Sequence, residues 1–408
     1  MKKLVPNMLG TYGPWAAEYV EARKRSLSFL HSKWSRVEEW REKAREKVLS
    51  LLNPPYPTGV PENRAEVTRR YTYRQLEIEE ITWKLPYGPP TEAIFMKPAD
   101  TSGPLPGILA LHDHGAVKYF GKRKIIRTSD HTHPYILEHQ GTYYGGVGWA
   151  DELARRGYGV LIHDVFPFES RKIRASELPG HVVKRMMAQA EDIEELKPED
   201  LEDDGIVNKY DVPEGEPTEA IISYNAFASR HEDIIAKSLF CAGLTWPGVF
   251  VREDQWALDY LCSRPDIDAD RVGCCGLSGG GLRTNYLAGL DDRIRCAVSV
   301  GFMTTWRDFL FNSCYTHTWM IYIPLLANSM DHPEILGMRA PLPTLVLSTD
   351  NDPLFDLAEV KRAARILSDI FEKAGSPATM CFSLYPGPHK FDLPMQKEAF
   401  EWLDRWLK

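Results

Sequence analysis

Beyond about residue 104, short apolar runs alternate with longer stretches whose apolar positions recur every three to four residues. Short continuous apolar runs are typical of strands buried on both faces, and the longer periodic stretches are typical of amphipathic helices. The predicted strands are PGILALH (106–112), GYGVLIHD (157–164), RVGCCGLS (271–278), IRCAVSVG (294–301), PTLVLSTD (343–350) and ATMCFSLYP (378–386). This alternation predicts an α/β fold with a mainly parallel central sheet and helices on both faces.

The N-terminal part of the chain follows a different pattern. Residues 14–52 have apolar positions at helical spacing and end before Asn53-Pro54-Pro55, which predicts a helical extension over residues 1–68. We expect its tryptophans, Trp15, Trp34 and Trp40, to pack against the core or a partner subunit. Residues 71–98 alternate in the manner of strands around a turn at 87–90, which predicts an antiparallel hairpin at the start of the main domain, 69–408.

Two segments interrupt the strand and helix alternation. The first, at about 170–245, contains the acidic run EDIEELKPEDLEDD (191–204). It is either a solvated helical insertion or a cap over a site, because long insertions in α/β enzymes lie on loops at the strand ends. The second, 304–329, is aromatic and apolar, so it could line a pocket or fill a core.

Composition narrows the kinds of partner. The chain has 408 residues and a net charge of −8, so it lacks the basic excess that nucleic acid or an anionic membrane surface requires. Its first 15 residues lack the apolar run of a signal peptide, and no stretch approaches the roughly 20 apolar residues of a membrane span. Seven scattered cysteines fit buried free thiols in a reducing compartment. We expect a cytoplasmic protein without a cofactor that acts on a small molecule.

The strongest chemical signal is Gly276-Leu277-Ser278-Gly279-Gly280-Gly281, between a predicted strand and a predicted helix. A serine on such a tight turn is held exposed in a strained backbone, and its neighbours must be small to avoid colliding with the strand or helix. This context predicts that Ser278 is a nucleophile.

A serine nucleophile needs a base, and the base needs an orienting acid, in the chain order serine, acid, histidine. His389 is the one histidine beyond His332, and it follows the last predicted strand. Asp350, Asp352 and Asp356 are candidates for the acid. Asp352 is preferred, because it lies just past a strand end and Pro353 fixes the following turn.

An acyl-transfer site also needs hydrogen-bond donors for the oxyanion. The first predicted donor is the backbone N–H of Gly279, and the second is the backbone N–H of His114 in the loop LHDHG (111–115). We expect the side chains of His112 and His114 to hold this loop in place rather than to take part in the chemistry.

Other histidines raise the alternative of a metal site. His131 and His133, with His139 nearby, lack a third ligand of clear spacing and lie on no H-E-x-x-H helix, so no metal is predicted. His163-Asp164 ends a predicted strand, and we expect it to order that strand end and the pocket wall.

Five segments together resemble bacterial α/β hydrolases of the dienelactone-hydrolase and acetyl-xylan-esterase type. They are LHDHG (111–115), IHDVFPFESR (162–171), DYLCSRPDIDADRVGCCGLSGGG (259–281), STDNDPLF (348–355) and YPGPHKF (385–391). The resemblance spans about residues 70–408 and implies a triad of Ser278, Asp352 and His389, with oxyanion donors at His114 and Gly279. Such relatives usually have His-Gly-x-Gly in the first loop, and here Asp113 replaces the first glycine.

These observations favour an enzyme that cleaves a carboxylic ester through an acyl-enzyme, such as a deacetylase of sugars or small molecules. A C–C or amide-bond hydrolase would use the same triad with another pocket. A non-catalytic binding protein on this scaffold is disfavoured by the complete triad in the correct order. Assembly of a homo-oligomer through the N-terminal helices is a further expectation.

Overall fold

The computed structural model describes residues 7–20, 25–55, 65–101, 103–187, 212 and 214–408. A single nine-stranded sheet has the order β1-β2-β3-β5-β4-β6-β7-β8-β9. The strands β1 to β3 and the β3–β5 pair are antiparallel, and the pairs from β5 to β9 are parallel. The strands are β1 Glu66–Tyr73, β2 Leu76–Trp83, β3 Thr91–Pro98, β4 Leu105–Leu111, β5 Gly159–His163, β6 Ile267–Leu277, β7 Ile294–Val300, β8 Thr344–Thr349 and β9 Met380–Tyr385.

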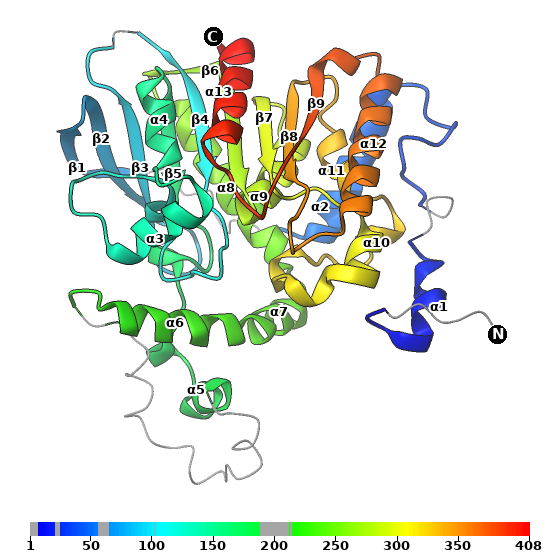
Figure 1. Ribbon diagram of the computed structural model, residues 1–408, viewed down its shortest axis with the longest axis horizontal. Coiled ribbons are helices and arrows are strands. Elements are labelled where there is room, and N and C mark those ends of the chain that lie inside the picture. Colours follow the sequence, from blue (N-terminus) through cyan, green and yellow to red (C-terminus); the bar gives the residue numbers. More distant parts are fainter. Residues whose placement is uncertain (1–6, 21–24, 56–64, 102, 188–211, 213) are drawn as a thin grey trace.

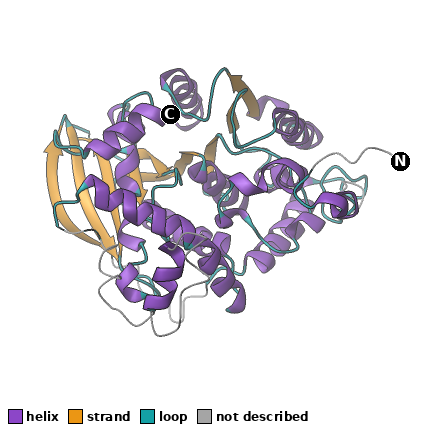
Figure 2. Ribbon diagram, turned by 60° about the horizontal axis from the view of Figure 1, so that its bottom comes forward, coloured by secondary structure: helices purple, strands orange, loops and turns teal. Residues whose placement is uncertain are grey.

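Helices cover both faces of this sheet (Figure 1 and Figure 2). One face packs with α2, α8, α9, α11 and α12 around a large apolar core, and the other packs with α4 and α13 around a second core. The helices are α1 Gly13–Ala17, α2 Val37–Leu52, α3 Pro134–Tyr143, α4 Trp149–Arg155, α5 Gly180–Met187, α6 Thr218–Arg230, α7 Glu232–Cys241, α8 Trp246–Ser263, α9 Gly279–Leu290, α10 Trp306–Asp308, α11 His332–Gly337, α12 Leu357–Lys373 and α13 Leu393–Leu407. The predicted α/β architecture and its six parallel strands are confirmed.

The N-terminal prediction is only partly correct. The helical stretch expected over 14–52 is divided into α1 and α2, and the described residues between them form turns. Tertiary contacts replace helical hydrogen bonds here: the N–H of Phe29 donates to the Glu334 carboxylate at 3.0 Å, and its ring stacks on Trp40. Trp40 is fully buried in the large core, whereas Trp15 is exposed. The extension is therefore part of the main domain's core at α2.

The predicted hairpin is present as β2 and β3, but it has an additional strand. The chain turns at Arg74-Gln75, where both residues have positive φ (47° and 65°), and β1 pairs back along β2. A two-residue turn of this kind usually uses Asn-Gly or Asp-Gly, so the sequence carried no signal for it.

The insertion predicted at 170–245 contains α5, α6 and α7, and its acidic run 191–204 lies outside the described residues. Helices α6 and α7 lie one after the other below the sheet in Figure 1 (green). A separate apolar cluster attaches α6 to the loop after β4, through Phe227 and Tyr224 on one side and Val117 and Phe120 on the other.

No single helix in the described ranges is long and apolar enough to cross a membrane. Helices α7 and α8 reach that length and composition only together, across a bend of 88°. The seven cysteines are free; Cys274, Cys275 and Cys296 are buried, as predicted, whereas Cys241 is exposed.

Candidate active site

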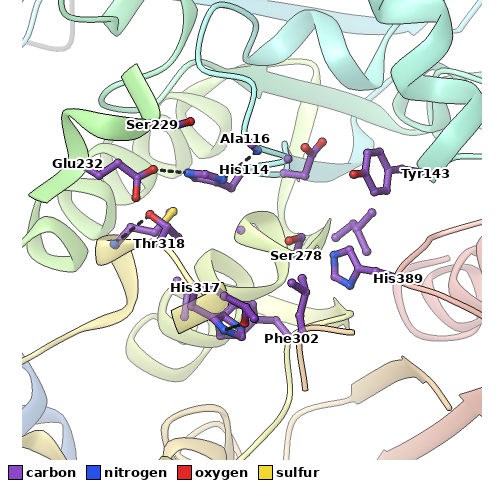
Figure 3. Close-up of a pocket in the computed structure, with 18 residues that line it drawn as sticks. His114, Ala116, Tyr143, Ser229, Glu232, Ser278, Phe302, His317, Thr318 and His389 are labelled. Carbon is purple, nitrogen blue, oxygen red and sulfur yellow. Dashed lines mark hydrogen bonds and ion pairs between the residues drawn. The ribbon is translucent and has the colours of Figure 1, made fainter. Parts of the chain in front are cut away.

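A pocket of about 340 Å³ lies at the carboxyl ends of the parallel strands, and three parts of the chain line it (Figure 3). The strand-end loops contribute Ser278, Gly279, His114 and His389. The 170–245 insertion and the 304–329 segment contribute the remaining polar wall, which contains Ser229, Glu232, Thr316, His317 and Thr318. Both insertions therefore reach the pocket that contains Ser278.

Ser278 occupies the turn between β6 and α9 with φ 58° and ψ −117°. The glycines on either side of Ser278 leave no room for a larger residue. A Cβ on Gly280 would lie 2.1 Å from the carbonyl oxygen of Leu111, and a Cβ on Gly276 would lie 2.6 Å from the backbone carbon of Gly280. The glycines therefore allow the strand and helix to approach closely, and the strained serine points its hydroxyl into the pocket.

His389 lies beside Ser278 in the pocket (Figure 3). Its Nδ1 is 2.6 Å from Oδ2 of Asp352, and its Nε2 has no hydrogen-bond partner among the described residues. Because Nδ1–H donates to the carboxylate, Nε2 is left as the acceptor on the Ser278 side. The other oxygen of Asp352 accepts the N–H of Leu354 at 2.9 Å, which fixes the carboxylate.

The three neighbouring aspartates have different contacts. Asp350 accepts the N–H of Gly387 at 2.9 Å and so joins the loop after β8 to the loop after β9. Asp356 caps the N-terminus of α12. Only Asp352 among the three contacts His389.

The two backbone N–H groups predicted to bind an oxyanion are neighbours. A Cβ placed on Gly279 would come within 2.9 Å of the backbone nitrogen of His114. Neither N–H donates a hydrogen bond to another residue in the described part of the chain. Both donors are thus free beside Ser278, which is the arrangement that an oxyanion requires.

Asp113, which replaces a glycine of similar loops, is buried and paired. Its carboxylate contacts the Lys124 ammonium at 3.3 Å and His139 Nε2 at 3.2 Å, and it also accepts the hydroxyl of Tyr144. Burial alone would raise the pKa of Asp113, but Lys124 and His139 outweigh it and hold the pKa well below its usual value. Asp113 is therefore an ionised anchor of the loop.

Lys124 also sets the direction of the 113–114 peptide. Its ammonium donates to the carbonyl oxygen of Asp113, and to those of His114 at 3.2 Å and Val117 at 3.3 Å. The C=O and N–H of a trans peptide point to opposite sides. A carbonyl of Asp113 held toward Lys124 therefore turns the N–H of His114 away from Lys124, and this N–H is the one that lies beside Gly279.

Four other histidines noted in the sequence have structural partners. His133 caps α3, and its Nε2 contacts the carbonyl of Glu216 at 2.9 Å, while His139 contacts Asp113. No group of three or more potential metal ligands occurs in the described ranges. His112 Nδ1 contacts the carbonyl of Asp113, and His114 Nε2 contacts Glu232 at 2.7 Å, so both side chains hold the loop.

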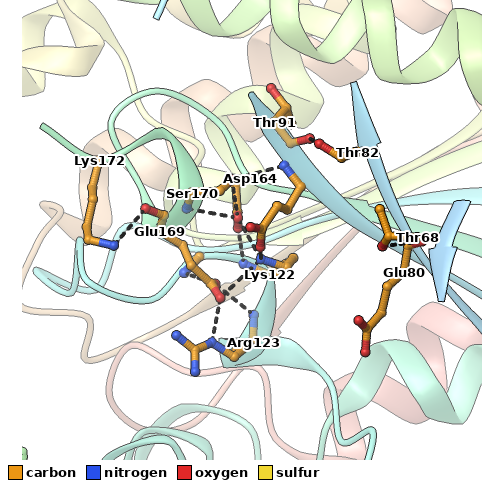
Figure 4. A network of polar contacts seen from close by, with 12 residues as sticks. Thr68, Glu80, Thr82, Thr91, Lys122, Arg123, Asp164, Glu169, Ser170 and Lys172 are labelled. Carbon is orange, nitrogen blue, oxygen red and sulfur yellow. Dashed lines mark hydrogen bonds and ion pairs between the residues drawn. The ribbon is translucent and has the colours of Figure 1, made fainter. Parts of the chain in front are cut away.

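His163 and Asp164 do not line the pocket themselves, and their contacts lie at the end of β5, the strand end that they were expected to order. His163 Nε2 lies 3.0 Å from Asp254, and Asp164 binds the Lys122 ammonium at 2.8 Å. Figure 4 shows Lys122 gathered between Asp164 and Glu169 beside the hairpin strands. These buried contacts order the end of β5, because His163 joins it to helix α8 and Asp164 joins it to the segment after β4.

The polar wall contributed by Ser229, Glu232, Thr316, His317 and Thr318 was not identified from the sequence. None of these residues lies in a recognisable motif, and each reaches the pocket through the packing of an insertion. The aromatic and apolar composition of the 304–329 segment was the only available signal.

A mainly parallel sheet with helices on both faces, a serine on the turn after β6 and an Asp–His pair on loops after later strands are the features of the α/β-hydrolase fold. The prolyl oligopeptidase family model matches residues 246–382, a range that includes Ser278 and Asp352. The chain is 26% identical over 318 residues to YtaP of Bacillus subtilis (strain 168), which carries the name of a hydrolase; the match covers 77% of this chain and 83% of YtaP.

Solved structures show the same fold. A Bacteroides fragilis NCTC 9343 protein with the name of an acetyl xylan esterase superposes with a TM-score of 0.63 at 15% identity, covering 93% of this chain and 83% of the other. A glucuronoyl esterase from Solibacter usitatus superposes with a TM-score of 0.57 at 15% identity, covering 94% and 97%. The resemblance to α/β hydrolases predicted from the sequence is confirmed.

Proposed function

We propose that this protein is a serine esterase that cleaves a small carboxylic ester through an acyl-enzyme. The observation that carries the proposal is the 2.6 Å contact between Asp352 and Nδ1 of His389, together with the position of His389 beside Ser278 in one pocket, where its Nε2 has no other partner among the described residues. This is the arrangement that turns a weak hydroxyl into a nucleophile.

In the proposed mechanism, Ser278 Oγ attacks the ester carbonyl carbon while His389 Nε2 takes the hydroxyl proton. The carbonyl oxygen becomes an oxyanion and accepts hydrogen bonds from the N–H groups of Gly279 and His114. His389 then gives its proton to the alcohol oxygen as the bond between that oxygen and the carbonyl carbon breaks. The alcohol departs, and the acyl group remains bound to Ser278 as an acyl-enzyme. Water attacks that ester with the same base, and the acid product leaves. Asp352 orients the imidazole and stabilises its protonated form.

Labelling with a fluorophosphonate tests the nucleophile. We expect the wild-type protein to form a covalent adduct at Ser278, located by mass spectrometry, and the Ser278→Ala variant to form none. Ser229→Ala is a matched control, because Ser229 lines the same pocket without contacting the Asp–His pair, and it should still be labelled. A folded wild-type protein that stays unlabelled would contradict every serine-hydrolase mechanism.

The match to the prolyl oligopeptidase family supports a second candidate, the cleavage of an amide bond by the same residues. A series of p-nitrophenyl esters of rising acyl length and a matched series of aminoacyl p-nitroanilides separate the two. We expect turnover of the short esters. Turnover of the anilides alone, with labelling of Ser278 intact, would transfer the proposal to amide hydrolysis.

A further inference from the structure

Glu232 begins helix α7 of the 170–245 insertion and reaches across the pocket to the loop after β4 (Figure 3). Its Oε1 lies 2.7 Å from His114 Nε2 and 2.5 Å from the Lys118 ammonium. Its other oxygen accepts the N–H of Trp319 from the second insertion at 3.3 Å. One buried carboxylate therefore joins both insertions to the loop that contains His114.

The contacts of the His114 ring define its protonation. The N–H of Ala116 donates to His114 Nδ1 at 3.0 Å, so Nδ1 is an acceptor and the ring proton is on Nε2. Burial lowers the pKa of His114, which keeps the ring neutral with this single proton. The Nε2–H group therefore donates to Glu232, and the ring is held at both nitrogens.

The same loop has further attachments to the insertion. The side-chain oxygen of Asn225 in α6 accepts the N–H groups of Lys118 at 3.0 Å and Tyr119 at 2.9 Å. Of all these contacts, only the one from Glu232 acts on His114 itself, whose backbone nitrogen lies beside Gly279. Rotation of the His114 ring and its backbone is thus restrained from the insertion side.

We propose that Glu232 is a positioning residue for the reaction: by holding the His114 ring, it keeps the His114 N–H aimed at the oxyanion. This inference rests on the proposed function, because it assigns the insertion a part in the same acyl transfer. The insertion then contributes to the rate of the chemical step as well as to the shape of the pocket.

The variants are chosen to separate positioning from folding. Glu232→Gln retains an oxygen that can accept the hydrogen bond from His114 Nε2–H, whereas Glu232→Ala removes this acceptor. Glu232→Ala combined with Lys118→Met removes both charges of the buried pair and avoids an unpaired lysine. Asp233→Ala is the matched control, because Asp233 is the next residue of α7 and pairs with Lys237 on the exposed face.

Loss of a whole oxyanion donor lowers kcat by about 10²- to 10³-fold. A donor that is present but poorly aimed should cost less, so with p-nitrophenyl acetate we expect Glu232→Ala and the double variant to lower kcat by about 10- to 100-fold. The KM should change by less than about threefold. Glu232→Gln should recover most of kcat, and Asp233→Ala should match the wild type. A double variant that keeps kcat within threefold of the wild type would overturn the proposal.

Inhibition by paired ketones provides the decisive measurement. An alkyl trifluoromethyl ketone adds to the serine and forms an oxyanion, whereas the corresponding methyl ketone only occupies the pocket. In the double variant, we expect the Ki of the trifluoromethyl ketone to rise by the same factor as kcat falls, with the Ki of the methyl ketone unchanged. An equal rise for both ketones would show general damage and overturn the proposal. Fluorophosphonate labelling of the wild type tests the proposed function separately.

Discussion

The pocket has two sides that differ in how the chain builds them. On the strand-end side, Ser278 directly follows β6, Asp352 lies three residues after β8, and His389 lies four residues after β9. On the insertion side, Glu232, His317 and Thr318 come from long segments outside the sheet. The first side is fixed by strand register and the second by the packing of helices and loops.

This difference explains how the work of the site is divided. The carboxyl ends of parallel strands lie at one edge of a sheet, and β6, β7, β8 and β9 are consecutive neighbours in it. Residues just past these strands must therefore meet, however far apart they are in the chain. The insertion side has no such constraint, so the packing of helices and loops alone places its residues in the pocket wall.

The largest expected effect is on the strand-end side. Asp352→Asn should keep the shape of the site but remove the charge that orients His389 and stabilises its protonated form, so we expect kcat to fall by about 10³- to 10⁴-fold. Steady-state kinetics with p-nitrophenyl acetate measure this effect.

Asp350→Asn is the matched control, because Asp350 lies two residues away on the same loop and contacts the backbone of Gly387. We expect it to change kcat by less than about tenfold. If Asp350→Asn has the larger effect, the acid has been assigned to the wrong aspartate.

Lys124 supports the strand-end side from within the core. Lys124→Met combined with Asp113→Asn removes the buried pair and the ammonium that donates to the Asp113 carbonyl. His112 Nδ1 remains as the second contact of that carbonyl, so the His114 N–H should be held less firmly in its direction. We expect kcat to fall by about 10- to 100-fold at constant KM. Lys122→Met is the comparison, because Lys122 is an equally buried lysine that binds Asp164 rather than the peptide. It should lower the Tm and leave kcat of the folded protein near wild type; an equal fall in kcat would contradict the assignment.

The sequence predicted the residues whose roles follow from local patterns. Ser278 is recognisable because glycines surround it between a strand and a helix, and His389 because it follows the last strand. The partners of Asp113 could not be predicted, because Lys124, His139 and Tyr144 are 11 to 31 residues away and meet it only through tertiary packing. Glu232 was missed for the same reason. The strand β1 was missed because its turn, Arg74-Gln75, has none of the usual turn residues.

The smallest expected effect concerns the stability of the packing between helix α11 and the 304–329 segment. His332 is fully buried against Phe302, Trp306 and Phe309, and burial lowers its pKa to about 4. In the unfolded chain its pKa is about 6.5, so between these values the unfolded state binds the proton and the free energy of unfolding decreases as pH falls. At about 1.4 kcal/mol per pH unit, this contribution is about 2 kcal/mol at pH 5.

His332→Phe keeps an aromatic ring at this position but cannot bind a proton. Urea unfolding at pH 7 and pH 5 measures how much stability each protein loses on acidification. We expect the variant to lose about 2 kcal/mol less than the wild type. His131→Phe is the control, because it makes the same replacement at an exposed histidine. If the two variants lose equal stability on acidification, His332 does not titrate on unfolding.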